Sequence, residues 1–372
     1  MRLIFDSHLD LGWCGAHFGR DLTADVDDIR AAEEGMSDEK SRGRNVLSLP
    51  ELRRAGVAVC VATLLSRSGT ELQRSLGGYK RTDLDYPSPA IAYTGAHAQL
   101  AWYRLMEEQG QMRMIRTAAD LQRHWDQYAG APQTTPLGYI LSMEGADPVI
   151  EPAQLQYWWD QGLRAIGPAH YGRGRYAYGT AVDGPIGDTG GVLLREMRRL
   201  GILLDVTHLS DRSFADAMAV YHGPLLASHH NCRALVPGDR QLTDEQIRQI
   251  VSRGGVIGVA LDAWMMYPNW QRGVTQPDVV KLDALADHID HICQLAGNRN
   301  HAAIGTDLDG GFGYEQTPRD LNKYRDLQKL ESILESRRYA AADVDAVFNG
   351  NWLRFFLAAL PLGAASAHRD PV

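Results

Sequence analysis

A histidine and an aspartate two positions apart, His8 and Asp10, end a short apolar run at the start of the chain. Successive side chains of an extended strand point to opposite faces, so residues two apart point the same way. The spacing therefore lets an imidazole and a carboxylate approach one metal ion from the end of a strand. Such triplets are common by chance, so the pair gains meaning only if other strands end in complementary residues.

Five further side chains of suitable type follow later apolar runs: Glu144, His170, His208, His229 and Asp307. Imidazole and carboxylate are groups that Zn²⁺ accepts as ligands, and a catalytic zinc site keeps one position open for water. A carboxylate can also bridge two ions about 3.5–4 Å apart. In that case His8, Asp10 and Glu144 would hold one ion. Glu144, His208 and His229 would hold the other.

Each of these residues also has a plainer interpretation. His208 could cap the helix that is expected to follow it, and Glu144 could form an ion pair with Arg164. Asp307 and Asp309 could be simple turn formers. The recurrence of such residues after strand upon strand favours one shared site over independent accidents.

The stretches between these positions alternate between strand and helix patterns. Apolar, β-branched runs predict eight strands, at residues 3–10, 57–65, 137–143, 163–167, 202–207, 224–228, 255–261 and 302–306. Helical spacing, often closed by glycine, predicts helices over 49–56, 89–110, 117–128, 152–161, 192–200, 211–221, 243–253 and 283–297, with two more at 341–348 and 351–360. Thr243 with Gln246 three residues later is a capping signature.

Repeated strand–helix units of this number predict a single (β/α)8 TIM barrel. The alternative is a doubly wound open sheet, whose ligands would gather at one crevice. Active sites of (β/α)8 barrels lie at the carboxyl ends of the strands, where the seven polar residues are expected. We expect one domain over residues 1–362 and a disordered tail over 363–372. Residues 19–45 are expected to form a loop or surface helix over the barrel mouth, and 66–88 a second insertion.

Composition narrows the class of partner. The 372 residues are 44% hydrophobic and 23% charged, and the net charge of −8 gives no reason to expect nucleic acid. No apolar run approaches the ~20 residues that a membrane span needs, and the early first strand leaves no room for a signal peptide. The four cysteines form no C-x-x-C pair, which suits a reducing compartment. We therefore expect a cytoplasmic protein without nucleic-acid or membrane partners.

Five short sequence blocks follow one another along the chain: DSHLD at 6–10, MEG at 143–145, DVTHLS at 205–210, SH at 228–229 and GTDLDG at 305–310. In these blocks the chain resembles the membrane (renal) dipeptidase family, peptidase family M19 of the amidohydrolase superfamily. The resemblance runs from about residue 3 to residue 357. It implies a metal-dependent hydrolase barrel that cleaves dipeptides with two Zn²⁺ ions bridged by Glu144 and a hydroxide. It also implies a homodimer, and tolerance of a D-residue at the C-terminal position of the substrate.

The resemblance further implies roles for individual residues. The zinc ligands would be His8, Asp10, Glu144, His208 and His229. His170 would donate a hydrogen bond to the tetrahedral intermediate, and Asp307 would shuttle the proton between nucleophile and leaving amine. Arg240 would bind the substrate carboxylate through paired hydrogen bonds. Arg233 is the competing candidate for the carboxylate, and motif position favours Arg240.

The seventh predicted strand and the first two insertions differ from the family pattern. That strand leads into Asp262 and Trp264, where the family commonly has an asparagine and an aromatic residue, and residues 12–45 and 66–88 are unlike the mammalian members. These regions would line the side-chain pockets, so the preferred dipeptide is open. Hydrolysis of N-acyl amino acids or lactones is an alternative activity, and a metal-binding barrel without activity is a third.

Several histidines have no expected role in the site. His230 should point away from His229 if its strand is regular. His288 and His291 are three residues apart on a helix face with polar neighbours, and both are expected to be solvated.

Overall fold

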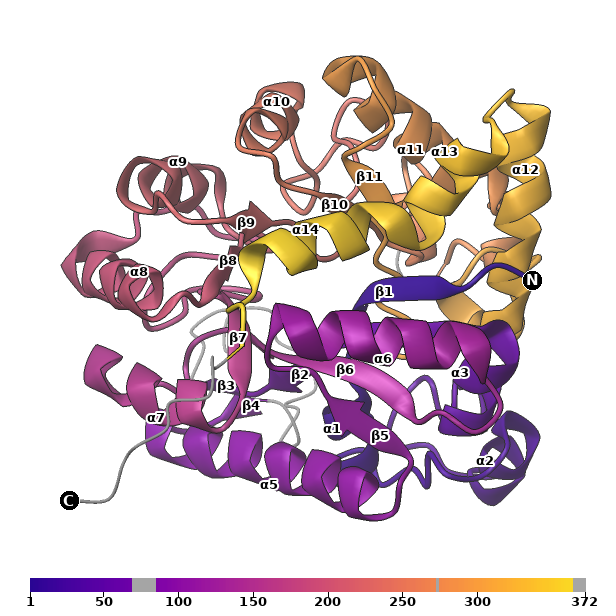
Figure 1. The fold of residues 1–372 in the computed structure, drawn as a ribbon, viewed down its shortest axis with the longest axis horizontal. Helices are drawn as coiled ribbons and strands as arrows, with labels where there is room; N and C mark the ends of the chain where they lie inside the picture. Colours follow the sequence, from indigo (N-terminus) through magenta and orange to yellow (C-terminus); the bar gives the residue numbers. More distant parts are fainter. Residues whose placement is uncertain (69–84, 272–273, 364–372) are drawn as a thin grey trace.

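The computed structural model describes residues 1–68, 85–271 and 274–363, and it shows helices arranged around a parallel sheet (Figure 1). Six strands pair side by side in the order β1 (Ile4–Leu9), β2 (Val57–Leu65), β6 (Leu137–Glu144), β7 (Leu163–Gly167), β8 (Leu203–Asp205) and β9 (Leu225–Leu226). A seventh strand, β5 (Met112–Met114), pairs with β6. A separate parallel pair is formed by β10 (Ile257–Val259) and β11 (Ala302–Ile304).

A backbone bridge and side-chain hydrogen bonds connect the two sheets. A single bridge between Ala227 and Ile257 joins β9 to β10. Asp6 on β1 accepts a hydrogen bond from the backbone N–H of Thr306 at 2.9 Å, just beyond β11. Within the described ranges no backbone ladder joins β11 to β1. The fold is therefore an α/β fold whose parallel sheet forms a half-barrel, and the closed (β/α)8 barrel stays a prediction.

Two glycines allow β10 and the end of β11 to lie close to the segment that follows β9. A Cβ atom at Gly258 or Gly305 would lie 2.1 or 1.9 Å from the carbonyl oxygen of Ser228. The hydroxyl of Ser7 also donates to the carbonyls of Ser228 and Ile304. A side chain at either glycine would separate β9 from the strands that follow it.

The helices that cover the sheet are α1 (Leu11–Ala16), α2 (Val26–Ala32), α3 (Leu49–Ala55), α5 (Pro89–Glu108), α6 (Ala118–Gly130), α7 (Leu155–Asp160), α8 (Gly187–Leu200), α9 (Asp211–Val220), α10 (Asp244–Ser252), α11 (Asp283–Ala296), α12 (Leu330–Ser336), α13 (Ala341–Asp345) and α14 (Asn351–Ala359). Short 3₁₀ turns lie at η1 (Pro152–Gln154), η2 (Ala263–Met265), η3 (Pro277–Val279), η4 (Tyr314–Gln316) and η5 (Tyr324–Lys329), and a π-helical turn at η6 (Ala346–Gly350). Two-residue strands β3 (Arg67–Ser68) and β4 (Asp85–Tyr86) pair in the second insertion.

All eight predicted strands are present, several of them shorter than expected. The capping box predicted for α10 is also present, since the Thr243 hydroxyl accepts from Gln246 N and the Gln246 side chain accepts from Thr243 N. The single helix predicted over 341–348 is instead α13 followed by η6. β5 and α12 were not predicted. Most of the insertion 66–88 and all but Gly363 of the predicted tail 363–372 lie outside the described residues.

Helix α14 lies across the sheet (Figure 1) and covers the end of the strands opposite the polar strand ends. Phe5 of β1 stacks on Phe356 with ring centroids 5.2 Å apart, and Trp352 Nε1 donates to the Ile304 carbonyl at 2.8 Å. The same buried cluster takes one or more residues from each of seven strands, among them Val59, Ile140, Ala165, Leu203, Leu226 and Ala303. We call this cluster, with its three α14 aromatics Trp352, Phe355 and Phe356, the apolar base.

The prediction that His288 is solvated is wrong. Its side chain is buried, with 1% of its surface exposed, and Nδ1 accepts a hydrogen bond from the backbone N–H of Cys232. Burial lowers the pKa of His288 to about 3. His291 is partly buried, and its Nε2 lies 2.8 Å from an Asp244 oxygen. The face of α11 that carries both residues packs against the neighbouring segments, so the acidic neighbours in sequence misled the prediction.

All four cysteines, Cys14, Cys60, Cys232 and Cys293, are buried free thiols. Among the helices of the described residues, none combines the length and the apolar character required to cross a bilayer.

Candidate metal centre

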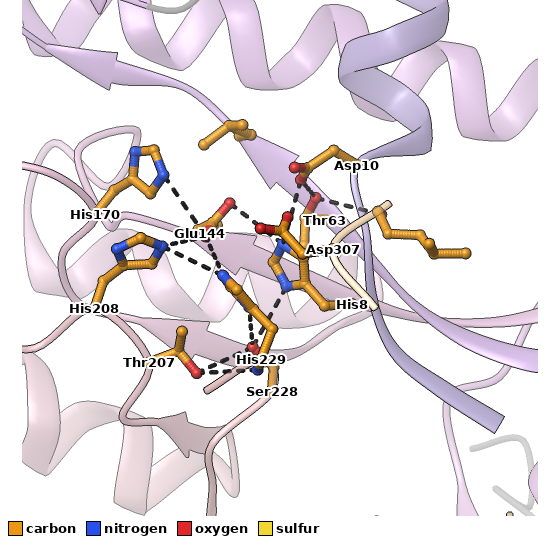
Figure 2. Close-up of polar contacts among 12 residues, drawn as sticks. His8, Asp10, Thr63, Glu144, His170, Thr207, His208, Ser228, His229 and Asp307 are labelled. Atoms are coloured by element: carbon orange, nitrogen blue, oxygen red, sulfur yellow. Dashed lines mark hydrogen bonds and ion pairs between the residues drawn. The ribbon is translucent and has the colours of Figure 1, made fainter. Parts of the chain in front are cut away.

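The polar side chains predicted at the strand ends come together in one place (Figure 2). Three overlapping groups have ligand atoms within 4.8 Å of one another: His8, Glu144 and His229; Glu144, His170 and His208; and His8, Asp10 and Asp307. Residues almost three hundred positions apart in sequence meet because parallel strands bring their carboxyl ends to one edge. His230 is buried beside His229 but belongs to none of these groups.

The carboxylate of Glu144, the last residue of β6, lies between two sets of imidazoles. Its Oε2 is 3.5 Å from His8 Nε2. Its Oε1 is 3.2 Å from His208 Nε2 and 3.3 Å from His229 Nε2. The two oxygens of one carboxylate therefore face different ligands, which is the geometry that a bridge between two ions requires.

The Nε2 atom of His8 is buried and has no hydrogen-bond partner among the described residues. It lies 3.7 Å from an Asp10 oxygen and 3.8 Å from an Asp307 oxygen, besides its approach to Glu144. Buried polar atoms are nearly always satisfied, so an orphaned imidazole nitrogen facing three carboxylates marks a place for a cation. Nitrogen and carboxylate oxygen donors in this combination fit zinc.

Hydroxyl groups hold the far sides of the candidate ligands. Thr180 Oγ1 lies 2.8 Å from His208 Nδ1, and Ser228 Oγ lies 2.9 Å from His229 Nδ1 and 3.4 Å from His8 Nδ1. A hydroxyl oxygen can accept a hydrogen bond from Nδ1–H, which leaves the lone pair on Nε2 for a metal. The Thr63 hydroxyl instead donates, to the carboxylate oxygen of Asp10 that faces His8 (Figure 2).

Two residues of the site adopt an unusual backbone conformation. His208 has φ 67° and Asp307 has φ 58°, in the left-handed region that side chains other than glycine rarely occupy. Strain of this kind collects at functional sites, where the surrounding structure imposes it. Asp205 helps to impose it here, because its carboxylate accepts from the backbone N–H groups of both Thr207 and Ser228 at 3.0 Å.

The plainer interpretations of these residues do not hold. Ser210, not His208, caps α9. Arg164 donates to the backbone carbonyls of Arg116 and Trp159 and does not pair with Glu144. Asp309 does more than form a turn, because its carboxylate accepts from the backbone N–H groups of residues 46 and 47 and so fastens the first loop to the loop after β11.

Burial and neighbouring charges shift the pKa values in opposite directions across the site. Burial opposes ionisation of Glu144, but the charge of His8 holds its pKa well below the usual value. Burial would lower the pKa of His8, but the charges of Glu144 and Asp10 raise it well above 6.5. Burial, together with the charges of Asp10 and Glu144, raises the pKa of Asp307 well above the usual value.

The imidazoles on the other side of Glu144 behave differently. Burial lowers the pKa of His208 and of His229 well below 6.5, and the charge of Arg240 lowers both further. Burial lowers the pKa of His170 to about 3, and the charges of Arg67 and Arg240 act in the same direction. These rings are therefore neutral, as an imidazole must be to bind a metal.

The two arginines proposed for the substrate carboxylate occupy different environments. Arg240 is buried at 2% exposure, donates from one terminal nitrogen to the His229 carbonyl at 3.0 Å, and leaves the other, Nη1, without a partner among the described residues. Arg233 is engaged with the Asp211 carboxylate through both terminal nitrogens at 2.8 Å. Only Arg240 therefore has a free donor beside the candidate metal ligands.

Four residues around the site were not identified from the sequence: Thr63, Arg67, Thr180 and Ser228. Ser228 directly precedes His229, and Thr63 lies near the end of β2. Their types and positions near strand ends were available as signals, but hydroxyl residues are too common for these signals to be selective.

Comparisons with known proteins point to one family, the membrane dipeptidases. The family model described as membrane dipeptidase (peptidase family M19) matches residues 2–367. An uncharacterised protein in the pqqA 5′ region of Klebsiella pneumoniae is 30% identical over 256 residues, which cover 66% of this chain and 88% of that protein. Dipeptidase aclJ of Aspergillus oryzae is 28% identical over 220 residues, covering 58% of this chain and 50% of that protein. The chain thus matches only about half the length of the latter relative.

Two solved structures share the fold over nearly all of both chains. One is the dipeptidase AC, a metallopeptidase of family M19, with a TM-score of 0.73, 23% identity, and coverage of 97% of this chain and 99% of that one. The other is a metallopeptidase from Rhodobacter sphaeroides bound to a phosphinate mimic of the dipeptide L-Ala-D-Ala, with a TM-score of 0.72, 21% identity, and coverage of 97% and 100%.

Proposed function

Because the chain belongs to the membrane dipeptidase family, peptidase family M19, we propose that this metallo-dipeptidase uses two zinc ions to hydrolyse dipeptides, including those with a C-terminal D-residue. One observation carries the proposal: the two oxygens of Glu144 face His8 on one side and His208 with His229 on the other. The phosphinate mimic of L-Ala-D-Ala bound to the Rhodobacter relative supports the stereochemical part.

The chain offers a complete donor set for two ions. His8, Asp10 and Glu144 would hold one, and Glu144, His208 and His229 the other. Bound there, the ions would supply Lewis acidity, which lowers the pKa of a water shared between them and polarises the peptide carbonyl.

Asp307 is the proposed proton carrier. Its carboxylate lies 3.8 Å from His8 Nε2 and is partly exposed at the mouth of the site. Because its pKa is raised well above the usual value, it can hold the proton that the attacking water loses and release it to the departing amine. The two transfers leave Asp307 unchanged after one turnover.

His170 and Arg240 are proposed to bind the two ends of the reacting group. Neutral His170, with Nε2 3.8 Å from a Glu144 oxygen, can donate a hydrogen bond to the oxyanion that forms at the carbonyl. The free Nη1 of Arg240 can bind the C-terminal carboxylate of the substrate. A dipeptide spanning both would have its scissile bond over Glu144.

The same proposal includes the architecture around the site. We infer one domain over residues 1–362 that closes as a (β/α)8 barrel, because β11 already contacts β1 through Asp6 and Ser7. A cytoplasmic location and a homodimer stay predictions from the sequence and the resemblance.

The test is to purify the chain, measure zinc by mass spectrometry and assay L,L-dipeptides, L,D-dipeptides, N-acyl amino acids and lactones side by side. We expect about two zinc ions per chain and hydrolysis of dipeptides in preference to the other two classes. Turnover of N-acyl amino acids or lactones alone would replace the dipeptidase activity by another hydrolase activity. Tight zinc binding without any turnover would indicate a metal-binding barrel.

A further inference from the structure

The guanidinium of Arg67, on strand β3, lies against the ring of His170. Its Nη1 is 3.0 Å from His170 Nδ1. The contact joins the second insertion to the loop after β7, two segments about one hundred residues apart in sequence. Neither the sequence analysis nor the family resemblance gave Arg67 a role.

A guanidinium determines which nitrogen of a neutral imidazole carries the proton. Arginine has only N–H donors and no acceptor, so a hydrogen bond to Arg67 requires a lone pair on His170 Nδ1. The single proton of the neutral ring must then be on Nε2. That nitrogen faces Glu144 Oε1 at 3.8 Å, and therefore faces the candidate metal centre.

The same reasoning separates His170 from the three candidate ligands. Nδ1 of His208 faces the Thr180 hydroxyl, and Nδ1 of His8 and His229 faces the Ser228 hydroxyl. Hydroxyls accept from Nδ1–H and leave a lone pair on Nε2, whereas Arg67 places a proton there. The partner of Nδ1 therefore sorts four neighbouring imidazoles into three metal ligands and one hydrogen-bond donor.

We propose that Arg67 is a positioning residue that fixes His170 as the Nε2–H tautomer, which keeps this ring off the metal and aims its donor at the developing oxyanion. The proposal rests on the dipeptidase function proposed above for its catalytic consequence. The tautomer itself follows from the Arg67 contact alone.

Two buried carboxylates hold Arg67 and His170 in this arrangement. Arg67 Nε donates to Asp85 of β4 at 2.6 Å, and only 12% of the arginine side chain is exposed. Asp147 accepts from the backbone N–H of Ser68 through one oxygen and from that of Arg175 through the other, both at 2.8 Å. The strand that carries Arg67 and the loop that carries His170 are thus fastened to the same carboxylate.

The tautomer can be measured directly on the full chain. In protein labelled with ¹⁵N-histidine and freed of metal by a chelator, long-range ¹H–¹⁵N spectra distinguish protonated from unprotonated ring nitrogens. A His170→Asn variant identifies the His170 signals. We expect an unprotonated Nδ1 and a protonated Nε2 in the wild type, and a mixture of tautomers in Arg67→Met. An unprotonated Nε2 in the wild type would overturn the proposal.

Kinetics on the zinc-loaded protein test the consequence. Loss of one oriented oxyanion donor costs about 10²–10³-fold in rate, so partial loss of the correct tautomer in Arg67→Met should lower kcat about 10- to 100-fold with KM within about threefold. Arg67→Lys keeps a donor and should recover part of kcat. Arg173→Met, an exposed arginine of the same loop as His170, is the matched control and should leave kcat unchanged.

Arg67→Met also deprives the buried Asp85 of this guanidinium, so the double variant Arg67→Met/Asp85→Asn should be compared with it by circular dichroism and kinetics. A folded variant of either kind with wild-type kcat and an unchanged His170 spectrum would refute the positioning role. If no dipeptide is hydrolysed by the wild type, the dipeptidase function fails while the tautomer spectrum still decides the role of Arg67.

Discussion

The two ends of the parallel strands are built from opposite chemistry. At the carboxyl ends, buried carboxylates and imidazoles crowd around Glu144, and His8 Nε2 has no hydrogen-bond partner in the described part of the chain. At the apolar base, the α14 aromatics pack against residues from seven strands, with Trp352 Nε1 hydrogen-bonded to a strand carbonyl. Burying like charges is costly, whereas burying aromatic surface is favourable. The base therefore contributes the stability that allows the metal centre to be assembled.

The largest effect should come from Glu144→Gln, which removes the charge from the carboxylate that faces both sets of imidazoles. We expect kcat/KM to fall at least about 10,000-fold, or about 5.5 kcal/mol, together with loss of bound zinc. The midpoint of thermal unfolding of the metal-free chain should also fall, because the lowered pKa of Glu144 means that its charge stabilises the folded state. Glu151→Gln, at an exposed position, is the control. Full zinc content with full activity would contradict the bridging role.

The substitution Phe356→Ala tests the apolar base. Removing a fully buried aromatic ring from the base should lower the free energy of unfolding by about 3–5 kcal/mol, measured by urea denaturation. Under conditions where the variant is folded, kcat should stay within about twofold of the wild type. Phe356→Leu, which keeps most of the volume, should lose less stability. A large drop in kcat for folded Phe356→Ala would mean that the apolar base affects the activity of the metal centre as well as the stability of the fold.

The substitution Arg240→Met compares two arginines near the carboxyl ends of the strands, Arg240 and Arg233, as partners of the substrate carboxylate. Loss of the buried Nη1 donor of Arg240 should raise KM for dipeptides about 10- to 100-fold, because the substrate carboxylate then lacks its charged partner. Arg233→Met is the matched control, since that side chain is engaged with Asp211. The reverse pattern, with KM raised only in the Arg233 variant, would reassign the carboxylate site.

The smallest expected effect is on the pH dependence of stability, and it comes from His288, a buried imidazole outside the candidate metal centre. The pKa of buried His288 is about 3, below its value of about 6.5 in the unfolded chain, so the unfolded state binds more protons between these pH values. Its contribution to the free energy of unfolding should therefore fall as pH is lowered, by about 1.4 kcal/mol from pH 7.5 to 5.5. Urea unfolding of the wild type and of His288→Gln should show a shallower pH dependence in the variant. Equal pH dependence would contradict neutral burial of His288.

The strand ends could be predicted because two sequence signals coincide there. A buried parallel strand is a continuous apolar run, and a histidine or carboxylate directly after it is conspicuous, as at Glu144 and His229. The geometry then follows from the fold, since parallel strands bring these positions to one edge. Even the left-handed conformation of His208, which the sequence did not indicate, left it in reach of Glu144.

The partners of those residues could not be predicted. Arg67 reaches His170 only because β3 pairs with β4 and is fastened to Asp147, and such contacts depend on tertiary register that periodicity does not encode. His288 was misjudged for the same reason, because its acidic neighbours in sequence indicate a polar face while the packed structure buries the ring. Side chains whose role depends on a distant partner are where local sequence patterns stop being informative.

A single hydroxyl, that of Ser228, touches one imidazole from each of the two proposed ion positions, and it donates in turn to Thr207. A shift of either ring as it engages its ion must move the oxygen on which the other ring depends. The two positions are thus mechanically linked, and loading of the chain should be cooperative, with half-filled molecules scarce when zinc is limiting.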